Sequence, residues 1–234
     1  MSTPHDNRVS LFSTLAVKGA LDFTILPRYE RDSGARAEST FDPTNVLLDK
    51  IESGARPDVM IGVSSSFDGL VTAGIIDGPS RKSIARTGVG LAVSPETPTP
   101  DISSPEALAS TLKQARSVAY SRTGASGVYF AELLLALGIS HEVNSRATIV
   151  EKGFTALAVV DGRADLAIQQ LSELRFVPEV QIVGPLPESI QHYTEFSAAL
   201  GTHAVGDRNA TALITALTTD YARTAYADAG LEVP

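Results

Sequence analysis

The sequence predicts an α/β protein of two lobes, in which each lobe is a mainly parallel sheet flanked by helices. Short apolar segments of strand length alternate with helical segments along the whole chain, an order typical of parallel sheets covered by helices. The 234 residues can form two lobes of roughly 100 residues each. Two long apolar segments, at residues 84–94 and 193–202, enclose a self-contained middle section and therefore indicate two crossings between the lobes.

The first lobe is expected to begin with strands and helices in alternation. We expect strands at residues 8–12, 35–41 and 58–63, and helices at residues 16–32, 43–52 and 67–73. Gly34, Gly54 and Gly74 follow these helices closely, in the position where glycine commonly ends a helix. Lobe I is predicted to comprise residues 1–86 and 200–234, because two final helices at 209–218 and 220–229 would return to it.

The second lobe is expected between the two crossings, at residues 87–199. A proline-rich segment at 95–105 follows the first long strand, and a second set of elements begins after it. That set comprises helices at 105–114, 127–137 and 153–160, and strands at 117–120, 166–169 and 181–183.

Six turns of small or polar residues join an apolar strand to the expected start of a helix. They are residues 13–16, 42–45, 64–66, 123–126, 150–153 and 169–172. A helix start presents backbone N–H groups without partners and the positive end of the helix dipole. Several helix starts that converge on one cleft form a pocket for a small anion, and we expect that cleft between the lobes.

The composition excludes several classes of function. A formal charge of -8 and a pI near 5.0 argue against nucleic acid and anionic membrane surfaces as partners, since both require clustered lysine and arginine. The absence of cysteine excludes disulfides, thiolate catalysis and cysteine-bound metals. The four histidines show no metal-ligand spacing, and the sequence has neither a Gly-Lys-Ser/Thr phosphate loop nor a Gly-x-Ser-x-Gly nucleophile turn. We therefore expect no metal and no cofactor.

The beginning of the sequence bears on location. The first ten residues are polar and show no secretory leader, and no apolar stretch reaches the about 20 residues that a membrane span requires. We expect a cytoplasmic monomer without membrane insertion. A periplasmic protein is the alternative, if a leader was removed.

Five segments carry a resemblance to a known family: residues 11–21, 41–54, 122–130, 164–174 and 221–230. The first of them reads Leu-Phe-Ser-Thr-Leu-Ala-Val-Lys-Gly-Ala-Leu. Together they resemble the type II periplasmic-binding-protein fold, and within it the molybdate-binding receptors of ABC importers. The likeness extends over essentially the whole chain, and it implies two α/β lobes that close on a small anion about two hinge crossings.

The resemblance also implies ligand-binding positions, at which this sequence departs from the molybdate pattern. Molybdate receptors hold the oxyanion with neutral donors, among them a serine whose position here reads Ala16 and a tyrosine whose position reads Gln169 or Gln170. Arg122 instead places a full positive charge just before Ser126. A guanidinium binds a carboxylate through two parallel hydrogen bonds, so the pattern suits an organic carboxylate at least as well as an oxyanion. The expected ligand-binding residues are Ser13, Thr14, Leu15, Ala16, Thr44, Asn45, Ser64, Arg122, Ser126, Gln169 and Gln170.

The aconitate-isomerase branch of the same superfamily is similar in fold, acts as an enzyme, and fits this departure. It implies a 1,3-proton shift within a polycarboxylate, with Glu151 as the first candidate base and Lys18 and Lys152 after it. The alternative is a binding protein, either a receptor that delivers its anion to an ABC permease or a cytoplasmic anion sensor.

Each candidate also has a purely structural interpretation. Glu151 can stabilise the dipole of the helix expected after it, and Lys18 can be solvated. Hydroxyls such as those of Ser13 and Thr44 cap helices in many proteins. Arg122 can form a surface or interlobe ion pair.

Overall fold

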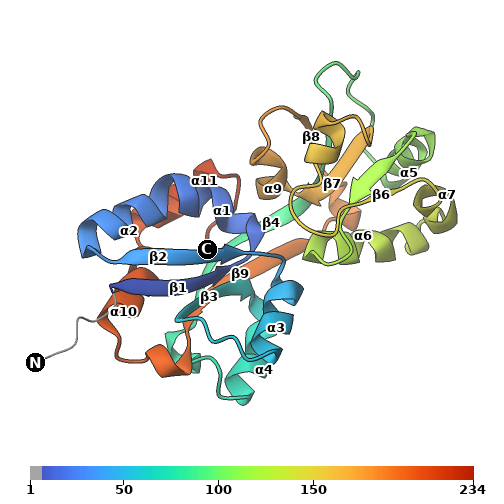
Figure 1. Ribbon diagram of the computed structural model, residues 1–234. Coiled ribbons are helices and arrows are strands. Elements are labelled where there is room, and N and C mark those ends of the chain that lie inside the picture. Colours follow the sequence, from blue (N-terminus) through green and yellow to red (C-terminus); the bar gives the residue numbers. More distant parts are fainter. Residues whose placement is uncertain (1–6) are drawn as a thin grey trace, which may run out of the picture. The chain divides into compact units, whose positions relative to one another are not determined.

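The computed structural model describes residues 7–234, which divide into two compact units. Unit 1 contains the chain through Arg86 together with Glu195–Pro234, and unit 2 is Thr87–Thr194. Strands β4 (Lys82–Val93) and β9 (Tyr193–Leu200) carry the chain from one unit into the other (Figure 1). The second boundary precedes the expected position at residue 199, because β9 pairs with a strand of unit 1 from Phe196 onward.

The sheet of unit 1 has the strand order β2-β1-β3-β9. Strand β1 (Arg8–Ser13) is parallel to both β2 (Arg36–Phe41) and β3 (Val59–Val63), whereas β9 is antiparallel to β3. Ser13, the last residue of β1, lies opposite Phe41 of β2 and Ile61 of β3. The turns that follow these three strands therefore lie at one end of the sheet. We call residues 13–16, 42–45 and 63–66 the unit 1 rim.

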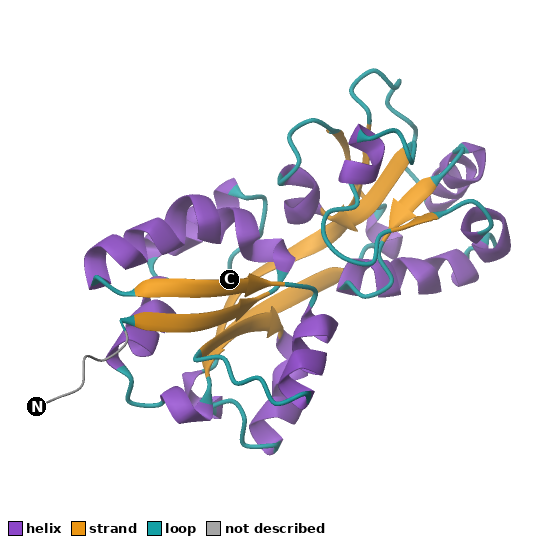
Figure 2. Cartoon of the chain, viewed as in Figure 1, coloured by secondary structure: helices purple, strands orange, loops and turns teal. Residues whose placement is uncertain are grey.

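Helices cover both faces of this sheet (Figure 2). Consecutive residues of β3 alternate between two cores: Val59 and Ile61 pack in the cluster beneath α2 (Leu26–Ser33), α10 (Arg208–Ala216) and α11 (Asp220–Asp228), whereas Met60 packs with α3 (Thr44–Glu52) and α4 (Phe67–Thr72). This period of two is what a strand buried on both faces requires.

The helix expected at residues 16–32 is a helical stretch of changing geometry. A 3-10 turn (Leu15–Val17) leads into α1 (Lys18–Ala20), a π-helical segment (Leu21–Ile25) and then α2. The π segment lies just before Pro27, which has no N–H to donate to a preceding carbonyl. Further 3-10 turns occur at Ser64–Ser66, Gly78–Ser80, Glu188–Ile190 and Thr202–Ala204.

The sheet of unit 2 has the order β4-β7-β5-β6, with β8 (Gln181–Pro185) also pairing β4. Strand β5 (Val118–Tyr120) is parallel to β6 (Thr148–Ile149) and to β7 (Leu166–Gln170), so their following turns again share one end of the sheet. We call residues 121–126, 150–153 and 169–172 the unit 2 rim. The helices are α5 (Pro105–Gln114), α6 (Ala125–Ala136), α7 (Ser140–Asn144), α8 (Leu157–Val160) and α9 (Leu171–Arg175).

The predicted fold class is confirmed, and most expected elements are present. Besides the changing geometry of the first helical stretch, the differences lie in unit 2, where the short α7 and β6 were not expected and α8 is only the last part of the helix expected at 153–160. Within residues 7–234, no helix combines the length and the apolar character that crossing a bilayer would need.

Candidate functional site

Among the longer helices of the described chain, the two that start in the rims lack a side-chain cap. Five helices have nine residues or more, and three of them have a side-chain cap: Ser104 for α5, Asp207 for α10 and Thr219 for α11. The other two, α3 and α6, start in the rims after Pro43 and Gly124, which offer no side-chain cap. At the start of α6, the backbone N–H groups of Ala125 and Ser126 make no hydrogen bond among residues 7–234 and are left for another acceptor, such as a ligand oxygen or water.

In the unit 1 rim, the predicted hydroxyls already have protein partners. The Thr44 hydroxyl oxygen accepts a hydrogen bond from the backbone N–H of Val63 at 3.2 Å, and the Ser64 hydroxyl lies 2.8 Å from that of Ser197. These bonds tie the turns after β2 and β3 to the sheet. They use one hydrogen-bonding position of each hydroxyl, and a hydroxyl has more than one.

The turn after β1 is more deeply buried than a ligand-binding turn was expected to be. Ser13, Thr14, Leu15 and Ala16 are all buried, and the Thr14 N–H donates to the carbonyl of Ile61 at 3.1 Å. The Ser13 hydroxyl donates to the Thr14 carbonyl at 3.1 Å. Asn45, by contrast, is exposed at the start of α3. The turn at residues 13–16 can therefore offer a ligand its backbone groups more readily than its side chains.

Cations near the unit 1 rim are held by carboxylates. Lys18 is paired with Asp22, and its ammonium lies 3.9 Å from the centre of the Phe41 ring. Arg81 was not predicted: its guanidinium donates to the Ser64 carbonyl at 2.7 Å and pairs with Asp68 at 2.6 Å. Arg81 comes to this rim from a segment distant in sequence, and no motif marks it.

In the unit 2 rim, Ser121 organises the turn that carries Arg122. The Ser121 hydroxyl oxygen accepts from the N–H groups of Thr123 and Gly124, both at 3.2 Å. A β-carbon at Gly127 would lie 1.6 Å from the Ser121 carbonyl oxygen, so only glycine lets α6 approach the turn this closely. The turn and the start of α6, including the buried Ser126, are thus held in a fixed arrangement.

Arg122 itself is exposed, and within residues 7–234 its guanidinium makes no ion pair or hydrogen bond. The alternative of a surface or interlobe ion pair would therefore require a partner outside these residues. An unpaired guanidinium beside an uncapped helix start is suited to an anionic ligand.

Gln169 has a structural role that the sequence did not indicate. Its side-chain carbonyl accepts from the Thr155 N–H at 2.8 Å and from the Thr155 hydroxyl at 3.0 Å, while its amide nitrogen donates to the Gly153 carbonyl at 3.1 Å. The buried side chain thus fixes the loop after β6 and is not available in this arrangement as a ligand donor. Gln170, also buried, ends β7 and precedes α9.

The prediction of a helix start at residues 150–153 is wrong. Gly153 adopts a φ of 97°, in the left-handed region, and the next helix begins only at Leu157. Glu151 and Lys152 are exposed in this loop, and the Glu151 carbonyl accepts from the Thr123 hydroxyl at 3.0 Å. Glu151 is therefore not a helix-dipole partner, and its carboxylate remains at the unit 2 rim as a candidate base.

A second carboxyl group, that of Glu173, was missed. Glu173 lies in the first turn of α9 with only 7% of its surface exposed. Burial raises the pKa of Glu173 to about 8, although hydrogen bonds with the backbone N–H of Gln170 and the side chain of Gln169 act to lower it. The available signal was a glutamate at the third position of a helix, which can accept from the backbone N–H of the N-cap residue, here Gln170. The neighbouring Ser172 hydroxyl is buried and has no hydrogen-bond partner in the described chain.

The structure thus distributes the predicted residues over two groups. The unit 1 rim contains Ser13, Thr14, Leu15, Ala16, Thr44, Asn45 and Ser64. The unit 2 rim contains Arg122, Ser126, Glu151, Lys152, Gln169 and Gln170. Among the described residues, no group of three or more His, Asp or Glu side chains could hold a metal ion.

Comparisons with known proteins agree with this architecture. An aconitate isomerase from Pseudomonas sp is 33% identical over 214 residues, which cover 89% of this chain and 81% of that protein. The periplasmic molybdate-binding protein of Azotobacter vinelandii superposes with a TM-score of 0.80 at 17% identity, over 97% of this chain and 99% of its own. The sulfate-binding protein SubI of Mycobacterium tuberculosis gives 0.74 at 16% identity, over 96% and 86%. At such identities the two structures establish the fold alone.

A family model described as bacterial extracellular solute-binding protein matches residues 9–232. This match spans both units and includes every rim residue described above. The chain therefore belongs to the bacterial extracellular solute-binding protein family and has the type II periplasmic-binding-protein fold.

Proposed function

We propose that this protein binds a small organic polycarboxylate and isomerises it by a 1,3-proton shift, as an aconitate-isomerase-like enzyme. The observation that carries the proposal is the 33% identity to an aconitate isomerase over 89% of the chain. The unpaired Arg122 supports it, because a guanidinium binds a carboxylate with two parallel hydrogen bonds.

Binding would rest on local groups, since the chain as a whole is acidic, with a formal charge of -8. The uncapped start of α6 offers backbone N–H groups and a positive dipole end to a ligand carboxylate. Arg122 adds a full charge beside this start.

The chemical step requires a base, and Glu151 is the proposed one. Its carboxylate would take a proton from the carbon next to a substrate carboxylate, the double bond would move by one carbon, and the proton would return at the far carbon. Substrate and product then have the same atoms and charge. The backbone N–H groups at the start of α6 would stabilise the negative charge that develops on the carboxylate oxygens. Because Glu151 is exposed, its proton would exchange with solvent between removal and return.

Proton NMR of trans-aconitate incubated with the full chain tests this proposal, since the two isomers give separate signals. We expect conversion by the unmodified protein and a rate lower by about 10²–10⁴-fold in Glu151→Gln, the usual effect of removing a general base. Glu142→Gln is the matched control, because Glu142 is also exposed in unit 2 but lies on α7, before β6. Equal rates in all three proteins would remove Glu151 from the mechanism.

A receptor function is the second candidate, favoured by the likeness of the fold to molybdate- and sulfate-binding proteins. In that case the protein would bind its anion, present it to an ABC permease and leave it unchanged, and it would act in the periplasm. As the proposed enzyme, the protein would instead act in the cytoplasm as a monomer. Saturable binding of trans-aconitate without conversion would favour the receptor.

A further inference from the structure

A groove in unit 1, separate from both rims, has the features of a ligand site. Its volume is about 390 Å³, within the range that small-molecule pockets occupy. It lies among α2, α10 and the start of α11, and all of its lining residues belong to unit 1. Asn209, in its wall, donates to Asn7 at 3.1 Å, and Asn7 directly precedes β1. The groove therefore borders the end of the sheet opposite to the unit 1 rim.

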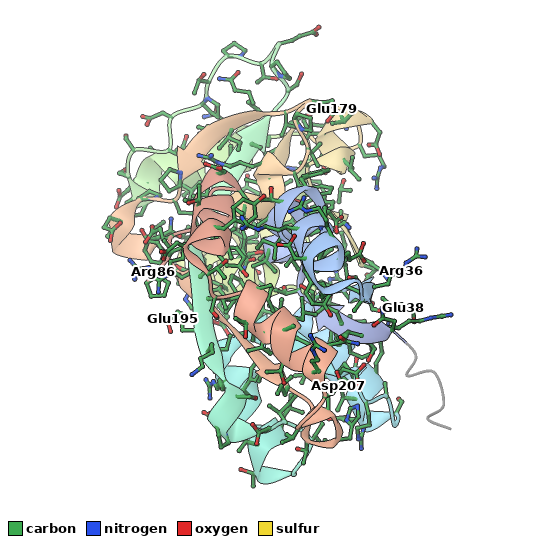
Figure 3. All side chains as sticks on the ribbon, turned by 90° about the vertical axis from the view of Figure 1, so that its left-hand side faces the viewer. Arg36, Glu38, Arg86, Glu179, Glu195 and Asp207 are labelled. Carbon is green, nitrogen blue, oxygen red and sulfur yellow. The ribbon has the colours of Figure 1, made fainter. Side chains whose placement is uncertain are left out.

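Among residues 7–234, the charged groups at the groove leave one cation, Arg208, without a partner. Asp32 is bound by two guanidinium groups, Arg28 at 3.4 Å and Arg31 at 3.1 Å. Asp207, labelled in Figure 3, uses its carboxylate to cap α10 through the Ala210 N–H at 2.8 Å. Arg208, next to it on the groove, is exposed and makes no ion pair or hydrogen bond among residues 7–234.

The groove also offers a surface for a planar ring. The Tyr221 side chain is 41% exposed, and the Arg28 guanidinium lies 4.2 Å from the centre of its ring. Ile25, Ala212 and Ala216 add apolar wall. The buried Tyr29 hydroxyl donates to the Asn209 carbonyl at 3.0 Å and so fixes the distance between α2 and α10. Aromatic and guanidinium faces stack on planar groups, and an unpaired guanidinium binds a carboxylate.

We propose that this groove is a second binding site, for a small aromatic carboxylate, in which Arg208 binds the carboxylate and Tyr221 contacts the ring. The site is independent of the proposed isomerase activity, because it shares no residue with either rim. Its ligand class is set by the one unpaired cation and by the apolar wall, which together match a monoanion with a flat body.

The test uses the full chain and 2-naphthoate as the probe, with binding measured by calorimetry and by saturation-transfer NMR. We expect saturable binding that Arg208→Gln weakens by about tenfold or more, the effect of losing a charged hydrogen bond. Tyr221→Ala should also weaken it, and the uncharged 2-naphthalenemethanol should bind correspondingly less well than 2-naphthoate.

Two control variants separate this site from other cations. Arg36→Gln removes an exposed arginine of the same unit, at the start of β2, whose side chain points away from the protein in Figure 3. Arg122→Gln removes the arginine of the unit 2 rim. Both should bind 2-naphthoate as the unmodified protein does. Unchanged binding in Arg208→Gln, loss in Arg122→Gln, or no saturable binding at millimolar probe would each overturn the proposal.

Discussion

The buried carboxyl of Glu173 should make the stability of this protein fall as the pH rises through the neutral range. Burial raises the pKa of this group in the folded protein from 4.5 to about 8. Between these two values the folded protein keeps the proton while the unfolded chain releases it. The unfolded state then binds fewer protons, so the free energy of unfolding decreases with increasing pH over this interval and levels off above it.

The size of the effect follows from the difference between the two pKa values. At about 1.4 kcal/mol for each pKa unit, a rise from 4.5 to about 8 corresponds to at most about 5 kcal/mol. That is a large part of the about 5–15 kcal/mol that stabilises a typical domain. Glu173→Gln keeps the shape of the side chain but removes its titration. At pH 7 this variant should therefore be more stable than the unmodified protein, by up to about 3 kcal/mol.

Urea unfolding of both proteins at a series of pH values between about 2.5 and 9 measures this difference. Subtracting the two curves cancels every group that titrates equally in both. Glu106→Gln serves as a control of opposite sign, because hydrogen bonds with its own backbone N–H and with Ser104 lower the pKa of the exposed Glu106. The Glu106 carboxylate should therefore add to the free energy of unfolding at neutral pH, and this contribution should be lost as the pH falls below about 4.5. If the Glu173→Gln and unmodified curves run parallel from pH 4.5 to 8, the burial argument is wrong.

Three further predictions concern the rims. Arg122→Ala should weaken carboxylate binding by about 1.5–3 kcal/mol in calorimetry, whereas Lys113→Ala, which removes an exposed charge at the end of α5, should leave it unchanged. Gln169→Leu removes three hydrogen bonds of a buried side chain and should lower the free energy of unfolding by about 2 kcal/mol or more in urea. Gly127→Ala should lower the melting temperature, because its β-carbon would lie 1.6 Å from a carbonyl oxygen, whereas Gly69→Ala, with nothing within 4 Å, should keep or raise it.

The alternation of strands and helices could be predicted because it depends on local patterns. Apolar segments bounded by turns located β1, β2 and β3 closely, and glycine at the helix ends located the stops. The parallel order then placed the turns after these strands at one end of the sheet, which is where the structure has them.

The roles of individual rim residues could not be predicted, because they depend on contacts between distant segments. Gln169 stands at a strand end like a ligand residue, but its partner Thr155 comes from a loop whose course the sequence did not reveal. Glu151 was assigned to a helix start that the left-handed Gly153 prevents. Glu173 was not singled out from the sequence, because only the packing around α9 makes it a buried acid.

The most direct test of the proposed proton shift is proton NMR of trans-aconitate incubated with the unmodified protein in deuterium oxide. We expect a product isomer that carries one deuterium at the carbon that receives the proton, because the exposed Glu151 carboxyl exchanges with solvent. Product without deuterium, or substrate that remains unchanged and unlabelled after prolonged incubation, would contradict it.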